Sequence, residues 1–437
     1  MNKILLAMLL LPCGILAQEH LRFNLSQDGK TYLKGSVRTA FWGRYYETNP
    51  NSTINNEAVT EASDFSIRRL RITFQGQLTP KLFFYSILGG NNFNLTTDGK
   101  TAKIGLLDLY TEYEFAPEFS LGIGKFGWNA SRNSMRSSKT MMGLDSPAFS
   151  LFTVNKNDDN ARNLGLFAKG RIDKLSYILT LKSPLAIKEP KEPKEGVVDF
   201  AKNAPRKQYS IGLKYDFLDK ENNKTAYTTG TYIGEKRIFN ISLGSVFQSK
   251  MMSELQNNVV KYYDYKNFSS EIFIDTPLSE KNNAITINLG YYYTDFGQEY
   301  IRNSGANSIT GVSSNEFFNG GGTAYPLIGT GDTFYFHFGY LFGKSEHFST
   351  RIQPNIAIQY SDFDGLKSKS ESEKYKSEVS KTQAELLQYT KQSELELSKA
   401  SRAVQDANSK IIFTQKAWEQ SKEAYRIRKN RYEQGLE

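Results

Sequence analysis

Hydrophobic and polar residues alternate one by one along most of the chain from about residue 31 to residue 360. In one segment, Leu70 and Ile72 fall on one face of an extended strand, and Arg69 and Arg71 fall on the other. The alternation recurs in the segments 107–115, 285–294, 333–342 and 351–360. A period of two residues is typical of a β-strand with one apolar and one polar face. The length of the segments suits strands that cross a membrane at a tilt.

Both a soluble β-sandwich and a transmembrane β-barrel show this alternation. Two features favour the barrel. Long charged side chains occupy the polar face in the middle of strands, and Tyr113, Phe115 and Phe119 gather at strand ends, as aromatic residues do at membrane interfaces. We therefore expect residues 18–365 to form a mainly β domain, an antiparallel transmembrane β-barrel of the porin type.

The connections between the expected strands alternate in length, as they do in outer-membrane barrels. Short turns are expected at 77–81, 116–118, 172–174 and 235–237, and long loops at 46–63, 128–162, 183–207, 249–266 and 296–331. The pattern predicts about thirteen strands, whereas single-chain bacterial barrels have an even number. Residues 434–437 also form no terminal strand that ends in an aromatic residue. We therefore expect the barrel to lack its last strands and to close imperfectly.

A helical pattern begins after the expected barrel. Residues 366–437 contain no Pro and are rich in Glu, Lys, Gln, Ser and Ala, which favour helix. Apolar residues recur there at every seventh position, namely Leu397, Val404, Ile411, Trp418, Tyr425 and Tyr432. This spacing predicts a long helix with a coiled-coil stripe of apolar residues, which pack against other helices. By itself, this pattern is also that of a generic coiled coil or of a charged tail.

The first residues have the features of an export signal. A short basic start precedes the apolar run Ile4–Ala17, which is too short for a transmembrane helix. We predict a signal peptide of residues 1–17. The only cysteine, Cys13, lies within it, so the mature chain would have no disulfide and no cysteine chemistry. No later stretch is apolar enough to cross a membrane as a helix, so a chain that spans one would need a closed barrel.

The formal net charge is +9, which fits solubility, an anion-attracting pore or nucleic-acid binding. No zinc-finger, RNP or helix-turn-helix pattern supports nucleic-acid binding. The three histidines form no cluster with metal-ligand spacing. No nucleophile elbow, Walker A motif or dinucleotide fingerprint stands in a suitable context. We expect no enzyme activity, no cofactor and no metal.

The first candidate pore residues are Arg69 and Arg71, which share the polar face of one strand. In a narrow wet lumen they would draw in anions, because charges there are poorly screened. They could equally pair with Asp108, Glu112 and Glu114 on the polar face of another strand and brace the wall. The residues alone leave both interpretations open.

The long loop after Trp128 supplies three further candidates, Arg132, Arg136 and Lys139. They would form a basic constriction if the loop folds into the lumen. They would be solvated surface charges if the loop lies outside the cell. Arg68 lies on the face opposite to Arg69, and we expect it to meet lipid headgroups.

Four segments resemble the phosphate-selective porin O/P family, and the resemblance extends over about residues 20–365. They are the arginine strand Ile67–Ile72, Gly-Lys-Phe-Gly at 124–127, the loop 131–139, and the segment Tyr227–Tyr232. The resemblance implies a water-filled barrel of about sixteen strands in the outer membrane of a Gram-negative bacterium, surrounded by lipid. Its expected function is passive diffusion of small polar or anionic solutes, with phosphate a candidate and a homotrimer a candidate assembly.

The tail resembles the periplasmic helices of TolC-like outer-membrane efflux proteins, through Ala417–Tyr425 and Asn430–Leu436. This second resemblance covers only about residues 365–437. It implies a periplasmic helix, and as an alternative function a component of an efflux or secretion channel with efflux-complex partners. About thirteen strands are too many for an efflux duct, in which each of several chains gives only a few. The porin is therefore the leading hypothesis.

Overall fold

The structure is a computed structural model of the chain. It describes residues 21–94, 104–150, 162–185, 191–203, 206–278, 283–298, 300–305, 307–313, 320–343, 351–363 and 369–435. The expected signal peptide, residues 1–17, lies outside these ranges. The chain divides into two compact units, residues 1–366 and 367–437.

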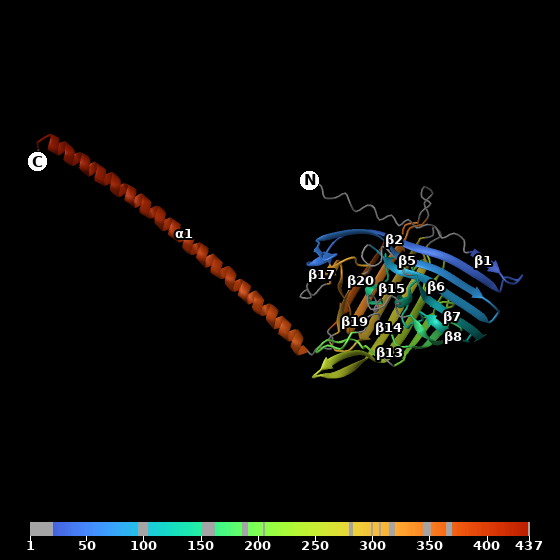
Figure 1. The fold of residues 1–437 in the computed structure, drawn as a ribbon. Coiled ribbons are helices and arrows are strands. Elements are labelled where there is room, and N and C mark those ends of the chain that lie inside the picture. Colours follow the sequence, from blue (N-terminus) through green and yellow to red (C-terminus); the bar gives the residue numbers. More distant parts are fainter. Residues whose placement is uncertain are drawn as a thin grey trace. The chain divides into compact units, whose positions relative to one another are not determined.

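The first unit is dominated by one 15-stranded sheet, two strands more than expected, in which neighbouring strands are antiparallel as predicted (Figure 1). Its path of neighbours runs through β1 (Leu21–Asn24), β2 (Tyr32–Glu47), β5 (Glu61–Gln77), β6 (Leu82–Phe93), β7 (Gly105–Ala116), β8 (Phe119–Phe126), β9 (Asn163–Ile172), β10 (Leu175–Lys182), β12 (Gln208–Asp216), β13 (Ile238–Gln256), β14 (Val259–Pro277), β15 (Ala284–Asp295), β19 (Gly331–Leu341) and β20 (Asn355–Asp362). Strand β11 (Asp199–Phe200) pairs with β13 beside this path. Two small sheets join β3 (Ser52–Ile54), β4 (Glu57–Ala58) and β17 (Gly311–Val312), and β16 (Ile301–Ser304) and β18 (Tyr325–Gly329).

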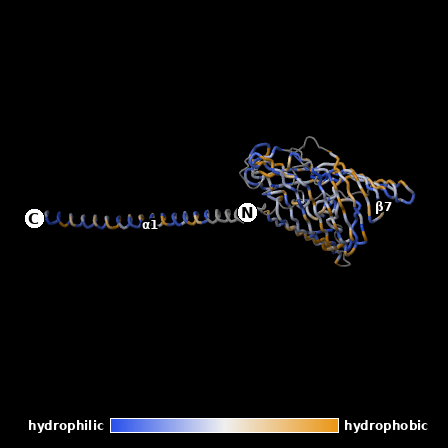
Figure 2. Tube along the Cα trace, turned by 90° about the horizontal axis from the view of Figure 1, so that it is seen from below, coloured by the Kyte–Doolittle hydropathy of each residue, from blue (hydrophilic) through white to orange (hydrophobic). Residues whose placement is uncertain are grey.

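The large sheet exposes its apolar face and buries its polar face. On β8 and β9, Leu121, Ile123 and Leu166 are exposed, whereas Asp108 on β7 and Lys182 on β10 are completely buried. Figure 2 shows hydrophobic and hydrophilic positions interleaved along the strands. This arrangement is the one that the alternation predicts for a barrel with an apolar outside and a polar inside.

The sheet is rolled, and its two ends approach each other at the rim that carries the long connections. Strand β3, between β2 and β5, pairs with β17, which lies between β15 and β19. Beside it, the Asn49 backbone N–H donates to the Gly322 carbonyl at 2.7 Å. Among the described strands, however, no ladder joins β20 to β1 or β2. In the described part of the chain the rolled sheet is therefore open along this line, in agreement with the expected lack of closing strands.

Two expectations about connections are wrong. The loop expected at 249–266 is instead the tip of a long hairpin, in which β13 and β14 meet at Asn257 and Asn258. Both asparagines have positive φ, as a two-residue hairpin turn of type I′ requires. The short turn expected at 235–237 is the end of a longer connection, residues 217–237, which we call the turn insert.

The connection between β8 and β9 also folds inward. We call its described first part, residues 127–150, the inner loop; it contains the 3-10 turns Asn133–Met135 and Ala148–Ser150. The inner loop and the turn insert come from opposite rims and meet through backbone hydrogen bonds. Thr228 donates to the Met135 carbonyl at 3.0 Å, and Ser137 donates to the Thr228 carbonyl at 2.9 Å.

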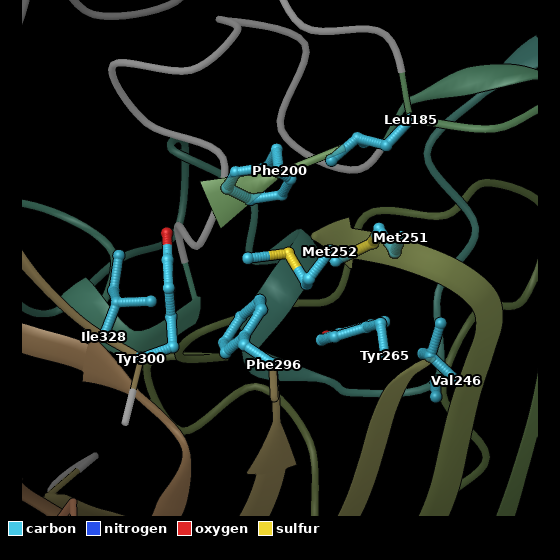
Figure 3. Packing of buried hydrophobic residues seen from close by; sticks show 10 residues of the cluster. Leu185, Phe200, Val246, Met251, Met252, Tyr265, Phe296, Tyr300 and Ile328 are labelled. Carbon is cyan, nitrogen blue, oxygen red and sulfur yellow. The ribbon is translucent and has the colours of Figure 1, made fainter. Parts of the chain in front are cut away.

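An apolar cluster fills the inside of the sheet near the long-connection rim of β13 and β14 (Figure 3). It brings together Met251 and Met252 of β13, Phe200 of the β10–β12 connection, and Phe296 and Tyr300 of the β15–β19 connection. Its members come from segments far apart in the sequence, so their packing ties the long connections to the wall on this side.

The second unit contains one long helix, α1 (Lys369–Glu433), as the sequence predicts. Its six heptad residues, from Leu397 to Tyr432, are each 60% to 77% exposed. In the part of the chain that the structure describes, no helix is both long and apolar enough to cross a membrane.

Candidate functional site

Three arginines of β5, Arg68, Arg69 and Arg71, face the inside of the rolled sheet. The ladder between β2 and β5 skips Arg68 between the pairs made by Ala40 and Phe41, so Arg68 is the extra residue of a β-bulge. The bulge turns its side chain inward, where it is 4% exposed. The expectation that Arg68 meets lipid headgroups is therefore wrong, because a bulge breaks the alternation on which it rested.

One carboxylate of the inner loop forms ion pairs with two of these arginines. Arg68 Nη2 lies 2.8 Å from Asp145 Oδ2, and Arg69 also forms an ion pair with Asp145. Burial alone would raise the pKa of Asp145, but the two guanidinium groups hold this pKa below its ordinary value. Asp145 thus connects the inner loop to the wall at β5.

The acidic residues that were expected beside the arginines have other partners. Asp108 accepts from Arg162 Nε at 3.0 Å, and Glu112 pairs with Lys169 at 2.8 Å. Glu114 is exposed. The interpretation that these three carboxylates brace Arg69 and Arg71 is therefore wrong.

A second bulge, at β6 and β7, also turns Leu107 inward against the expected alternation.

Arg71 differs from its two neighbours because it forms no ion pair in the described part of the chain. Its guanidinium donates to the Gly90 carbonyl at 2.8 Å and to Asn91 Oδ1 at 2.6 Å. These neutral acceptors orient the guanidinium without cancelling its charge.

A cavity of about 500 Å³ lies between the β2–β5–β6 wall, the inner loop and the turn insert. We call it the basic cavity. Its cationic lining residues are Lys34, Arg38, Arg68, Arg69, Arg71, Arg136, Lys139, Arg162 and Lys224, and no Asp or Glu is among the described residues that line it. Six of these cations form no ion pair with a carboxylate in the described ranges: Lys34, Arg38, Arg71, Arg136, Lys139 and Lys224.

The inner loop places Arg136 inside the sheet. Arg136 Nη1 lies 3.4 Å from His337 Nδ1 of β19, and the same guanidinium donates to Asn133. Arg132 and Arg136 are both buried, so the interpretation of a loop solvated outside the cell is wrong for them. Lys139 is exposed and reaches the basic cavity from the same loop.

Arg132 lies on the other side of the inner loop and does not line the basic cavity. It forms a two-pronged ion pair with Glu221 of the turn insert, at 2.6 Å and 3.0 Å, and its guanidinium stacks 3.6 Å from the Phe273 ring. Lys214 and Asn240 also bind the Glu221 carboxylate, at 3.0 Å and 2.9 Å. Burial would raise the pKa of Glu221, but Arg132 and Lys214 hold it well below its ordinary value. The Arg132–Glu221 ion pair is therefore a brace between the two inward segments, in which the carboxylate offsets the charge of the buried guanidinium.

Several residues that shape the site were not expected from the sequence. Lys34 and Arg38 lie on the inward face of β2, and the same two-residue period that revealed Arg69 and Arg71 could have identified them. Asp145, Glu221 and Lys224 lie in connections, where no periodicity reports on side-chain direction. Only the fold brings them to the site.

Residues 51–177 match the family described as phosphate-selective porin O and P. The match spans β5 to β9 and the whole inner loop, and it therefore supports a porin-like interpretation of this part of the wall. No curated protein matches the chain.

Among solved structures, the chain is similar to OmpF of Salmonella typhi in complex with daunomycin, at 9% identity and a TM-score of 0.34, over 76% of this chain and 98% of that one. A BenF-like porin from Pseudomonas fluorescens aligns at 10% identity and a TM-score of 0.31, over 76% and 95%. A trimer form of Vibrio cholerae OmpT aligns at 8% identity and a TM-score of 0.28, over 75% and 89%.

Proposed function

We propose that the chain is a porin of a Gram-negative outer membrane, through which small solutes diffuse passively and anions pass preferentially. The observation that carries the proposal is the basic cavity, with its nine cationic side chains and no carboxylate among its described lining residues. Clefts that are lined by one sign of charge and have walls of low dielectric concentrate counter-ions by about tenfold or more. Rings of basic side chains select anions in pores by the same means.

Phosphate is the anion that we propose as a preferred solute. A guanidinium group donates two parallel hydrogen bonds to phosphate oxygens, which favours arginine wherever phosphate is bound. Arg38, Arg71 and Arg136 line the basic cavity without a carboxylate partner in the described ranges. The family match over residues 51–177 points to the same solute.

We add two predictions to this proposal, one on the oligomeric state and one on the location of the C-terminal helix. We expect a homotrimer surrounded by lipid, as the resemblance to the porin family implies. A periplasmic location of α1 stays a prediction, which protease digestion of intact and permeabilised cells would test. The family match over residues 51–177 is to porins and gives no support to the alternative of an efflux component.

The proposal is tested by the reversal potential of the purified chain in a planar bilayer under a salt gradient. We expect stable open steps and a reversal potential of the sign that anion preference gives. The variant Lys34→Gln/Arg38→Gln/Arg71→Gln removes three of the basic-cavity cations that form no ion pair in the described ranges. We expect its anion-to-cation permeability ratio to fall by about tenfold.

The matched control removes three cations from α1 instead, in the variant Lys391→Gln/Lys399→Gln/Lys410→Gln. These side chains are exposed on the helix, and the control should keep the anion preference. Cation preference of the unmodified chain, or an equal change in both variants, would contradict the proposed function.

A further inference from the structure

One carboxylate of the wall, that of Glu271 on β14, holds the start of the inner loop. Its Oε2 accepts from the Arg132 backbone N–H at 2.6 Å. Its Oε1 accepts from the Asn133 backbone N–H at 3.1 Å and from Asn133 Nδ2 at 2.9 Å. The hydroxyl groups of Ser131 and Tyr292 also donate to Oε1, at 3.2 Å and 2.6 Å. Five hydrogen bonds to a side chain that is 1% exposed therefore fix this part of the loop on the wall.

Two glycines of the wall make room for this contact. A Cβ atom on Gly244 of β13 would lie 2.3 Å from the Ala130 carbonyl oxygen of the inner loop. Gly290 of β15 pairs with Glu271 in the ladder, and a Cβ atom there would lie 2.3 Å from the Tyr292 hydroxyl. Any larger residue at either position would push the loop or the tyrosine away. The wall is therefore shaped to receive the loop at this place.

Asn133 connects Glu271 to the basic cavity. Its Nδ2 donates to Glu271 and also to Asn288 Oδ1 at 2.9 Å, and its Oδ1 accepts from Arg136 Nη2. The two charged neighbours determine which way the amide points, because a carboxylate only accepts hydrogen bonds and a guanidinium only donates them. Asn133 is completely buried, so this orientation is also held by packing.

The guanidinium of Arg136 has few other restraints. Its Nη1 lies 3.4 Å from His337 Nδ1, and its Cζ lies 5.9 Å from the centroid of the Tyr335 ring. The backbone on both sides of Arg136 is held separately, by the hydrogen bonds of Met135 and Ser137 to the turn insert. Loss of the contact with Asn133 would therefore release the side chain while the loop backbone stays in place.

We propose that Glu271 is a positioning residue for anion selection, which acts through Asn133 and holds the Arg136 guanidinium at the basic cavity. This inference rests on the proposed function and deepens it. Glu271 is not among the described residues that line the basic cavity, whereas Arg136 is. Donors that are already oriented bind a passing anion without the cost of ordering a mobile side chain.

Two substitutions of Glu271 separate position from charge, because both remove the same negative charge. Glu271→Met leaves Asn133 without its acceptor, and the anion-to-cation permeability ratio should fall by about threefold as Arg136 is released. Glu271→Gln keeps one acceptor oxygen for Asn133 and should retain at least the ratio of the parent. Charge alone would raise the ratio equally in both variants. A rise in the Met variant, or equal ratios in the two variants, would overturn the proposal. The measurement is the reversal potential in a planar bilayer under a salt gradient.

Asn133→Ala tests the same route without any change of charge. It should lower the permeability ratio as much as Glu271→Met does, and it remains decisive if Glu271→Met fails to fold, which gel migration with and without heating shows. In the background of Arg136→Gln, neither substitution should lower the ratio further, because two residues that act through a third are not additive with it. A full additional fall in that background would show that Glu271 acts by another route and would refute the proposal.

The matched control is Glu254→Gln, which changes another buried carboxylate of the β13–β14 hairpin. Glu254 accepts from Tyr263 and makes no printed contact with the inner loop, so the permeability ratio should stay at that of the parent. The parent chain itself separates the two possible failures. If it shows no anion preference, the proposed function fails and this inference fails with it. If it prefers anions and Glu271→Met does so equally, only the positioning role of Glu271 is refuted.

Discussion

The two sides of the inner loop contain the same kinds of charged residue and use them differently. On one side, Arg132 is locked to Glu221, and Lys214 and Asn240 complete the group. On the other side, Arg71 has only neutral acceptors, and Arg38 has no ion pair in the described ranges. In the first arrangement, a carboxylate offsets the charge of Arg132 and holds two segments together. The second leaves charge uncancelled beside a cavity.

This comparison shows that the number of basic residues does not determine the strength of the electrostatic field inside a lumen. A buried guanidinium beside a carboxylate is a brace whose long-range potential is small. The same group with neutral acceptors retains its charge, and the low dielectric of the wall preserves the field. The two sides should therefore respond differently to substitution: one in stability, the other in selectivity.

The largest expected effect is on the stability of the braced side. Glu221→Ala leaves Arg132 buried without its carboxylate, which should cost about 3–5 kcal/mol, because an uncompensated buried charge is strongly destabilising. The free energy of unfolding in detergent, from denaturant titration, measures this effect. The same titration of Arg38→Ala should show a change of about 1 kcal/mol or less.

The double variant Arg132→Met/Glu221→Leu removes both charges and is the control for this prediction. It should recover most of the lost stability, because an apolar pair of similar volume can replace a buried ion pair. A Glu221→Ala protein as stable as the parent would mean that the brace does not carry the junction of the inner loop and the turn insert.

The next effect tests whether pairing controls selectivity. Asp145→Asn removes the carboxylate that forms ion pairs with both Arg68 and Arg69 at the edge of the basic cavity. The anion-to-cation permeability ratio should therefore rise, by about threefold or more. Asp173→Asn, at an exposed turn, deletes the same charge away from the cavity and should leave the reversal potential unchanged. A fall in anion preference for Asp145→Asn would break the comparison.

A smaller effect follows from the pH dependence of the brace. The pKa of Glu221 lies below its ordinary value of 4.5, so the carboxylate contributes its full stabilisation above pH 4.5 and loses it only as pH falls through the lower folded-state pKa. The difference in unfolding free energy between the parent and Glu221→Gln should thus be constant from pH 7 to about 4.5 and shrink in more acidic solution. If this difference already shrinks between pH 7 and 6, the loss of stability must come from the titration of a group other than Glu221.

The alternation of residues sufficed to predict the antiparallel sheet and its inward polar face. It failed at Arg68 and Leu107, because a β-bulge reverses the face on which every residue beyond it lies, and nothing in the local pattern marks the extra residue. It also failed at residues 249–266, where polar residues at the tip of a long hairpin look like a loop.

A different cause prevented the prediction of the partners of the candidate residues. Asp145 meets β5 from a connection about seventy-five residues further along the chain, and Glu221 meets Arg132 across a comparable separation. Such contacts depend on how two connections fold inside the sheet. The sequence therefore allowed both a solvated and an inward loop, and only the fold decides between them.

The smallest expected effect concerns Lys139, the exposed cation of the basic cavity. Its charge is open to solvent, and at physiological ionic strength mobile ions screen it within about 8 Å. Lys139→Gln should therefore change the permeability ratio by about twofold or less at 0.15 M salt, and by more at 0.01 M, where the Debye length is about 30 Å. Arg38→Gln, deeper on the wall, should change it at both salt concentrations. If the two variants showed the same salt dependence, depth in the lumen would not set the strength of these charges, and the contrast between buried and exposed cations would have to be abandoned.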